Sequence, residues 1–369
     1  MTQQWILPDA VFDGARLHSD MGVLTDGSHI LDLAYDIPKD AIARRETGII
    51  SPGFVDLQVN GGGGILLNQT PTSAGMQAIA KAHRRFGTVA ILPTVITDKP
   101  YILAQVVEAA IATHGAQGIA GLHIEGPHIS VARRGTHAAE FIRPLDDGTI
   151  AHVARLRSAG IAVMITVAPE AATPVQIGQL CALGAVVSLG HSDSTSETTN
   201  QFLAAGATCF THLFNAMSQM KNRAPGVVGA AINSDAYAGF ICDGIHVADE
   251  MLRLALRARP IVDRMFLVSD AMPTVGGPDS FKIYGQTISL HDGQLRNQEG
   301  SLAGAHVTQL EGVARLVGKI GIAPEAALRM AITVPARLMG LDHLATLKGR
   351  ALDDVLLLDA PFETARFLR

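Results

Sequence analysis

Four chemically reactive side chains stand at the ends of apolar runs that are far apart in the chain. They are Glu125, His191, His212 and Asp270. Two imidazoles and a carboxylate form the ligand set of a catalytic zinc-type site. A further carboxylate beside such a metal can act as acid and base, taking a proton from the attacking water and returning it to the leaving group. These residue types therefore predict a metal-dependent site with Asp270 as its acid/base.

Each of these residues alone has an ordinary structural explanation. Glu125 could be a solvated loop acid, either histidine a hydrogen-bonded core residue, and Asp270 the N-cap of a following helix. The four residues form a functional site only if they lie close together in the fold. Whether they do depends on the secondary-structure elements that contain them.

The apolar runs belong to a series of eight, most of them followed by a stretch with helical periodicity, which indicates an α/β fold. Eight such units are what a (β/α)8, TIM-like barrel requires, and the carboxyl ends of its strands meet at one rim. The expected strands are 48–59, 88–94, 119–125, 161–168, 185–191, 209–215, 238–243 and 265–270. The expected helices are 72–86, 100–114, 150–159, 174–183, 194–205 and 248–258.

Both ends of the chain have a different pattern, with short apolar runs between turn signals such as Asp13-Gly14 and Asp26-Gly27. We expect them to pair into a small β-sandwich domain made of residues 1–50 and 344–369. The barrel catalytic domain then spans 51–343, with a β-hairpin insertion near 276–301, where glycines mark the turns.

Composition excludes several other classes of protein. The net charge is −5, and no basic cluster exceeds Arg84-Arg85 or Arg133-Arg134, which argues against a nucleic-acid partner. Apolar stretches are interrupted before the ~18 residues of a membrane-spanning helix, so no membrane partner is expected. The three cysteines are far apart and are expected to be reduced. Without a secretion signal at the start, the expected location is cytoplasmic.

Short motifs around the reactive residues resemble one known family over nearly the whole chain. The motifs are Pro52-Gly53-Phe54-Val55-Asp56, His123-Ile124-Glu125-Gly126-Pro127, Gly190-His191-Ser192, Thr211-His212-Leu213-Phe214-Asn215-Ala216-Met217, Asp243-Gly244-Ile245-His246 and Val268-Ser269-Asp270-Ala271-Met272. Together they resemble the N-acetylglucosamine-6-phosphate deacetylases of the amidohydrolase superfamily. The resemblance implies a cytoplasmic enzyme of amino-sugar metabolism that hydrolyses N-acetylglucosamine 6-phosphate to glucosamine 6-phosphate and acetate. It also implies a homodimer in which the neighbouring subunit supplies part of the phosphate site.

The resemblance also assigns roles to residues. It implies that Glu125, His191 and His212 hold the metal, that Asp270 is the catalytic acid/base, and that His137 contacts the substrate near the scissile amide. A surface loop position is the alternative for His137. Arg223 and His246 suit a phosphate. The implied substrate-binding residues are Thr136, His137, Asn215, Ala216, Arg223, Asp243, His246, Leu302, Ala303 and Gly304.

Two positions bear on the number of metal ions. Many amidohydrolases carry His-x-His at the end of the first strand, whereas this chain has Gln58-Val59-Asn60. Neutral amides are weak ligands for transition metals, so we expect one divalent ion per chain, zinc before iron, manganese or cobalt. His128 is expected to be a loop residue rather than a further ligand.

The residues also leave other functions open. A deacetylase for N-acetylgalactosamine 6-phosphate would differ at a single sugar hydroxyl. A cyclic amidase of the dihydroorotase kind is disfavoured, because the run 161–168 has no lysine to bridge two metals. From a different class, a non-catalytic barrel could bind sugar phosphates as a sensor or scaffold. A purely structural role gives no reason for so many acids and histidines at strand ends.

Overall fold

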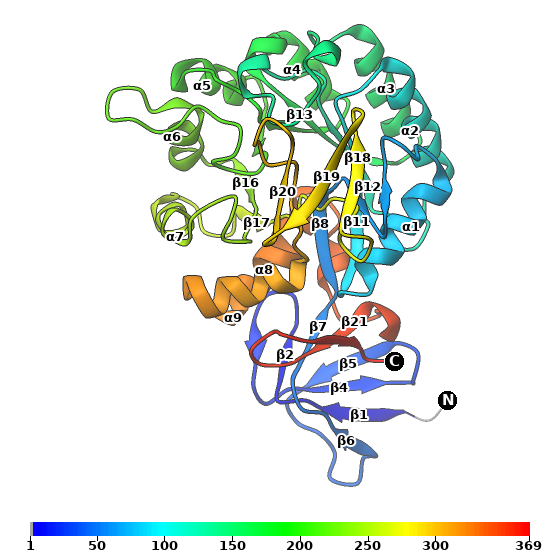
Figure 1. The fold of residues 1–369 in the computed structure, drawn as a ribbon. Coiled ribbons are helices and arrows are strands. Elements are labelled where there is room, and N and C mark those ends of the chain that lie inside the picture. Colours follow the sequence, from blue (N-terminus) through cyan, green and yellow to red (C-terminus); the bar gives the residue numbers. More distant parts are fainter. Residues whose placement is uncertain (1–2) are drawn as a thin grey trace.

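The computed structural model describes residues 3–369 and contains an eight-stranded parallel sheet surrounded by helices (Figure 1). Its strands follow the order of the chain from β8 to β17. Between the first and last strands, Val59 pairs in parallel with Ala271, which closes the sheet into a barrel. The strands are β8 (Phe54–Val59), β11 (Thr88–Ile96), β12 (Gly121–Glu125), β13 (Ala162–Val167), β14 (Val186–Leu189), β15 (Cys209–Phe210), β16 (Tyr237–Phe240) and β17 (Met265–Leu267).

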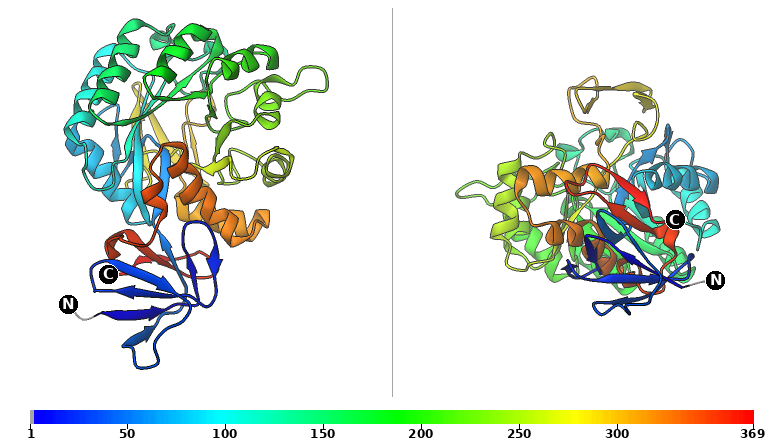
Figure 2. Two further views of the ribbon diagram at one scale, coloured as in Figure 1. Left: turned by 180° about the vertical axis from the view of Figure 1, so that it is seen from behind. Right: turned by 90° about the horizontal axis from the view of Figure 1, so that it is seen from below.

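Helices cover the outside of the barrel, and the strands beneath them are buried on both faces, as expected for a parallel sheet (Figure 2). Several helices begin at a threonine whose hydroxyl caps the first turn; Thr173 forms a capping box with Gln176. The helices are α1 (Ser73–Arg84), α2 (Pro100–Ala112), α3 (Asp147–Ser158), α4 (Pro174–Ala182), α5 (Ser196–Ala204), α6 (Gly226–Asn233), α7 (Asp249–Ala258), α8 (Gln309–Arg315), α9 (Pro324–Leu328) and α10 (Val334–Leu338).

The two ends of the chain meet in a β-sandwich below the barrel in Figure 1. One sheet has the order β5-β4-β1-β6 and the other β22-β21-β7-β2-β3. A separate apolar core, which includes Ile6, Val23 and Leu357, lies between them. The strands are β1 (Gln4–Leu7), β2 (Ala10–Phe12), β3 (Leu17–His18), β4 (Gly22–Thr25), β5 (Ile30–Ala34), β6 (Ala43–Arg45), β7 (Ile49–Pro52), β21 (Val355–Leu358) and β22 (Ala365–Phe367). The predicted fold class, a (β/α)8 barrel with a sandwich built from both termini, is confirmed.

The segment 48–59, expected as one strand, contributes to both parts of the molecule. Strand β7 pairs with β21 in the sandwich, and β8 pairs with β11 in the barrel. The change of partner occurs at Gly53, whose amide donates to the carbonyl of Asp354, while the next amide donates to the carbonyl of Gly87. The domain limits at residues 50 and 344 stay a prediction.

A small antiparallel sheet follows the last barrel strand, in the region where we expected a hairpin insertion. It consists of β18 (Ser280–Ile283), β19 (Gln286–His291) and β20 (Gln294–Arg296). It stands in front of the barrel in Figure 1 and projects from it in the right-hand view of Figure 2. A short hairpin, β9 (Gly61–Gly62) and β10 (Ile65–Leu66), follows β8. Among residues 3–369, every helix is too short or too polar to cross a membrane.

Candidate active site

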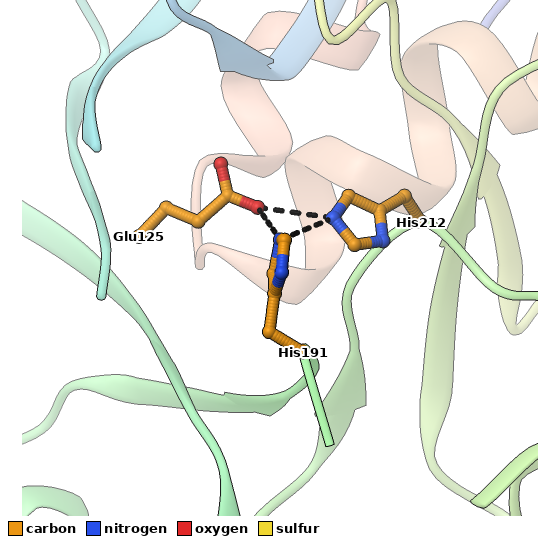
Figure 3. Close-up of side chains that lie close together, drawn as sticks. All are labelled: Glu125, His191 and His212. Carbon is orange, nitrogen blue, oxygen red and sulfur yellow. Dashed lines mark hydrogen bonds and ion pairs between the residues drawn. The ribbon is translucent and has the colours of Figure 1, made fainter. Parts of the chain in front are cut away.

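The three predicted metal ligands converge on one point at the rim of the barrel (Figure 3). Glu125 is the last residue of β12, and His191 and His212 each follow a strand end by two residues. The Nε2 atoms of the two histidines lie 3.1 Å apart. Glu125 Oε1 lies 3.1 Å from the Nε2 of His212 and 3.3 Å from that of His191. All three side chains are buried, so the structure brings together what the sequence places 87 residues apart.

Several of these residues have a left-handed backbone conformation, which sets the direction of their side chains. The φ angle is 48° at His191, 29° at His212 and 51° at Asp270. A residue with a Cβ atom adopts such angles rarely, at a cost on the order of 1–3 kcal/mol each, and such strain gathers at functional sites. His191, His212 and Asp270 are thus held by the chain just beyond their strands, where it turns at the rim.

The donor set fits a divalent ion. Nδ1 of His191 lies 2.8 Å from the carbonyl oxygen of Arg133, which can only accept, so this nitrogen carries the proton and Nε2 keeps its lone pair. A carboxylate oxygen and an imidazole nitrogen with a free lone pair, 3.3 Å apart, fit a divalent-metal site.

Asp270 lies beside this cluster, held by two amides from the end of β8. Nδ2 of Asn60 donates to Asp270 Oδ1 at 2.7 Å, and Nε2 of Gln58 donates to the same oxygen at 3.1 Å. Gln58 Nε2 also lies 2.9 Å from Glu125 Oε1, so one amide bridges both carboxylates. Burial, followed by the negative charge of Glu125, raises the pKa of Asp270 to about 6. A carboxyl group with such a pKa can both accept and release a proton near neutrality.

A cavity of about 360 Å³ opens over these groups. Its wall holds the four reactive residues together with most of the predicted substrate-binding ones. Those in the wall are Thr136, His137, Asn215, Ala216, His246, Leu302 and Gly304. Ile96 and Ser301, which the sequence did not mark as candidates, also line it. They are apolar or small residues without a motif of their own.

Three predicted substrate-binding residues lie outside this wall. Asp243 Oδ2 lies 2.6 Å from Nδ1 of His246 and orients that ring rather than facing the cavity. Ala303 is fully buried in the apolar cluster under the inserted sheet. Arg223 is exposed and lines a neighbouring cavity of about 480 Å³ together with Lys221 and Arg133. Within one chain, Arg223 is therefore not brought to the cavity above Asp270.

Two further histidines differ in their surroundings. His137, whose ring centroid is 4.5 Å from that of His191, is buried, and burial lowers its pKa to about 3, so the ring is neutral. His128 contacts the carbonyl oxygen of Arg143 and the hydroxyl of Thr149 at 3.1 and 2.9 Å. Both ring nitrogens of His128 are used in this way, which makes it a packing residue, as expected, and not a ligand.

Comparison with known proteins agrees with this geometry. The sequence pattern of the Amidohydrolase family matches residues 49–349. An N-acetylgalactosamine-6-phosphate deacetylase from Shewanella sp. is 38% identical over 86% of this chain and 81% of its own length. An N-acetylglucosamine-6-phosphate deacetylase from Haemophilus influenzae is 31% identical over 81% and 82% of the two chains. The crystal structure of N-acetylglucosamine-6-phosphate deacetylase from Pasteurella multocida superposes with a TM-score of 0.89 at 30% identity, covering 98% of this chain and 96% of that one. The chain belongs to the amidohydrolase family.

Proposed function

We propose that this chain hydrolyses the acetamide of N-acetyl-D-glucosamine 6-phosphate, giving D-glucosamine 6-phosphate and acetate, with one divalent metal ion per chain. The observation that carries the proposal is the meeting of Glu125, His191 and His212 beside Asp270 in a single cavity. The names of relatives that are 31–35% identical support the amino-sugar phosphate as substrate.

Glu125, His191 and His212 would hold the ion, with zinc preferred over iron, manganese or cobalt for this donor set. When bound, such an ion supplies an activated water and polarises a carbonyl oxygen. Asp270 accepts a proton from the attacking water and donates it to the nitrogen of the departing amine. His137, next to His191 in the cavity wall, faces the acetamide oxygen as negative charge develops there.

The phosphate gives the enzyme binding energy away from the reacting bond, which can be used to orient the amide. His246 lies in the cavity wall and is oriented by Asp243, so it suits the phosphate or a sugar hydroxyl. Arg223 is exposed in the neighbouring cavity, and we propose that in a homodimer it reaches the phosphate of the partner subunit's substrate. The protein is proposed to act in the cytoplasm.

A second candidate substrate is the epimer, N-acetyl-D-galactosamine 6-phosphate. It is favoured by the Shewanella relative, which is 38% identical and named for that activity. The two substrates share the acetamide and the phosphate and differ in one sugar hydroxyl. The same candidate site therefore fits either substrate.

Acetate release from both epimers and from unphosphorylated N-acetylglucosamine tests the proposal. We expect the metal-loaded protein to hydrolyse N-acetylglucosamine 6-phosphate with the highest kcat/KM and the unphosphorylated sugar with the lowest. A higher kcat/KM for the galacto epimer would favour the second candidate. Tight binding of either phosphate by metal-loaded protein without acetate release would instead indicate a sugar-phosphate sensor.

A further inference from the structure

His137 and His191 are neighbouring imidazoles with different partners for the same ring nitrogen. Nδ1 of His191 faces a backbone carbonyl, at 2.8 Å, and Nδ1 of His137 faces the hydroxyl oxygen Oγ1 of Thr97, at 2.7 Å. A carbonyl can only accept a hydrogen bond, whereas a hydroxyl can accept or donate one. The two rings can therefore carry their protons on opposite nitrogens.

The surroundings of Thr97 decide which way its hydroxyl points. The residue is fully buried, and within residues 3–369 its Oγ1 has no hydrogen-bond partner except His137. If Nδ1 of His137 carried the proton, the Thr97 hydroxyl hydrogen would be left without an acceptor. Buried polar groups are paired in native proteins, so the hydroxyl donates and Nδ1 accepts.

This arrangement places the ring proton of His137 on Nε2. Among residues 3–369 the only hydrogen bond of the His137 ring is the one at Nδ1, and the ring forms part of the cavity wall with Glu125 and Asp270. An N–H group in this wall can donate a hydrogen bond to an acetamide oxygen as negative charge develops there. The opposite tautomer would present a lone pair and repel the same oxygen.

Thr97 is itself held firmly. Just before it, Asn68 exchanges two hydrogen bonds with the backbone of Ile96, at 2.9 and 3.0 Å, as a neighbouring strand would. The hydroxyl of Tyr284, at the turn between β18 and β19, donates to the carbonyl oxygen of Thr97 at 2.5 Å. Contacts on both sides thus hold the backbone that carries the hydroxyl before any substrate binds.

We propose that Thr97 is a positioning residue that donates its hydroxyl hydrogen to His137 Nδ1 and so keeps His137 in the Nε2–H tautomer, ready to donate to the acetamide oxygen. The role in turnover rests on the proposed deacetylase function. The tautomer itself is a property of the protein alone and can be measured without substrate.

The first test compares two substitutions in the metal-loaded enzyme. Thr97→Val keeps the shape and removes the hydroxyl; Thr97→Ser keeps the hydroxyl and removes the methyl group. Loss of a contact that orients an active-site group typically costs about 10–100-fold in activity. We expect Thr97→Val to lower kcat by about that factor with little change in KM or metal content, and Thr97→Ser to keep most of the turnover. Equal kcat values for Thr97→Val and the wild type would overturn the proposal.

The second test is nitrogen NMR of ¹⁵N-histidine-labelled, zinc-loaded protein without substrate, with the His137 signals assigned by their loss in His137→Gln. We expect a protonated Nε2 and an unprotonated Nδ1 in the wild type and in Thr97→Ser, and a mixture of tautomers in Thr97→Val. A protonated Nδ1 in the wild type would refute the proposal even if Thr97→Val does not fold. If neither hexosamine phosphate is hydrolysed but the expected tautomer is seen, the proposed function fails while the assignment of Thr97 stands.

Discussion

The side-chain amide of Asn60 donates a 2.7 Å hydrogen bond to Asp270 Oδ1, from a position where many amidohydrolases have a metal-binding histidine. In this chain the end of the first barrel strand therefore contacts the proposed acid/base directly. The amide of Gln58 adds a second contact to the same oxygen at 3.1 Å. Two neutral donors hold one carboxylate oxygen, which leaves the other for the proposed proton transfer.

Asp270→Asn tests the acid/base role. We expect kcat to fall by at least about 100-fold, because positioned acid–base groups contribute about 10²–10⁴-fold. Metal content, measured by elemental analysis, should stay at one ion per chain, since Asp270 is not among the three proposed ligands. Asp342→Asn, at an exposed acid, is the control and should behave as wild type. Near wild-type activity in Asp270→Asn would show that another group moves the proton.

His191→Ala tests the metal centre. Changing groups that merely support ligands weakens metal binding about 10–100-fold, and we expect the loss of a ligand to cost at least as much. Elemental analysis after dialysis should give about one ion per wild-type chain and a small fraction of that for the variant. The exposed His114→Ala is the matched control. Two ions per wild-type chain would contradict the single-ion assignment based on Gln58 and Asn60.

Arg223→Ala tests the phosphate contact. A hydrogen bond to a charged group contributes about 1.5–3 kcal/mol, so we expect kcat/KM for the phosphorylated substrate to fall by about 10–100-fold. Hydrolysis of unphosphorylated N-acetylglucosamine should not change. Arg257→Ala removes an exposed arginine on α7 and serves as the control. An equal loss on both substrates would argue against phosphate recognition by Arg223.

Mixing variants tests whether Arg223 acts across a dimer. A heterodimer of Arg223→Ala and Asp270→Asn subunits has one site with both residues intact only if Arg223 comes from the partner chain. We therefore expect activity to rise when the two variants are unfolded together and refolded, and a sizing column to show dimers. If activity stays at the average of the separate variants, Arg223 serves its own chain or no chain.

Asp56 gives a pH dependence of stability that does not involve the metal ligands. This carboxyl group is fully buried, and burial raises its pKa from 3.8 to about 6. Because the folded-state pKa is the higher one, its contribution to stability is fully present below the unfolded pKa and is lost as pH rises through about 6. Relative to Asp56→Asn, the unfolding free energy of the wild type should fall by about 2–3 kcal/mol between about pH 4 and about pH 7.5. A difference that is constant with pH would rule out this buried ionisation.

Gly126 separates Glu125 from the turn that follows β12. Its φ angle is 82°, and a Cβ atom there would lie 2.3 Å from Thr97 Oγ1. Gly115 has a similar φ of 76° with nothing within 4 Å of such an atom. Both Gly→Ala variants should be destabilised by backbone strain, and Gly126→Ala by about 1–3 kcal/mol more from overpacking. Chemical denaturation measures this; equal losses at the two positions would mean that Thr97 gives way.

The barrel could be predicted from the sequence because its strands are apolar runs of characteristic length with capped helices between them. Other parts could not. The run 209–215 reads as a strand of seven residues, but pairing stops after Phe210, since the chain turns into the left-handed conformation at His212. The short helix α6 (Gly226–Asn233) follows an exposed loop and has no polar face. Its sequence therefore lacks the alternation of polar and apolar residues that predicts a helix.

For the site, the meeting of Glu125, His191 and His212 could be predicted because each ends an apolar run with a side chain that is rare there. Thr97 could not, because a threonine at the end of a strand is ordinary and its meaning depends on His137, 40 residues away in the chain. Likewise, Gln58 and Asn60 mark an absent ligand pair in the sequence, and only the fold shows that their amides point to Asp270.

The segment 49–59 forms β7 before Gly53 and β8 after it. One extended stretch of chain therefore links the sandwich to the rim of the barrel where the candidate site lies. Strand β7 pairs with four residues of β21, and β8 continues the chain from β7 to Gln58 and Asn60. Removing the last fifteen residues, which include β21, would leave β7 without its antiparallel partner, and any resulting shift would pass along β8 to the two amides. The C-terminal strand β21 thus contributes, through β7 and β8, to the position of the two amides that hold Asp270, the proposed acid/base.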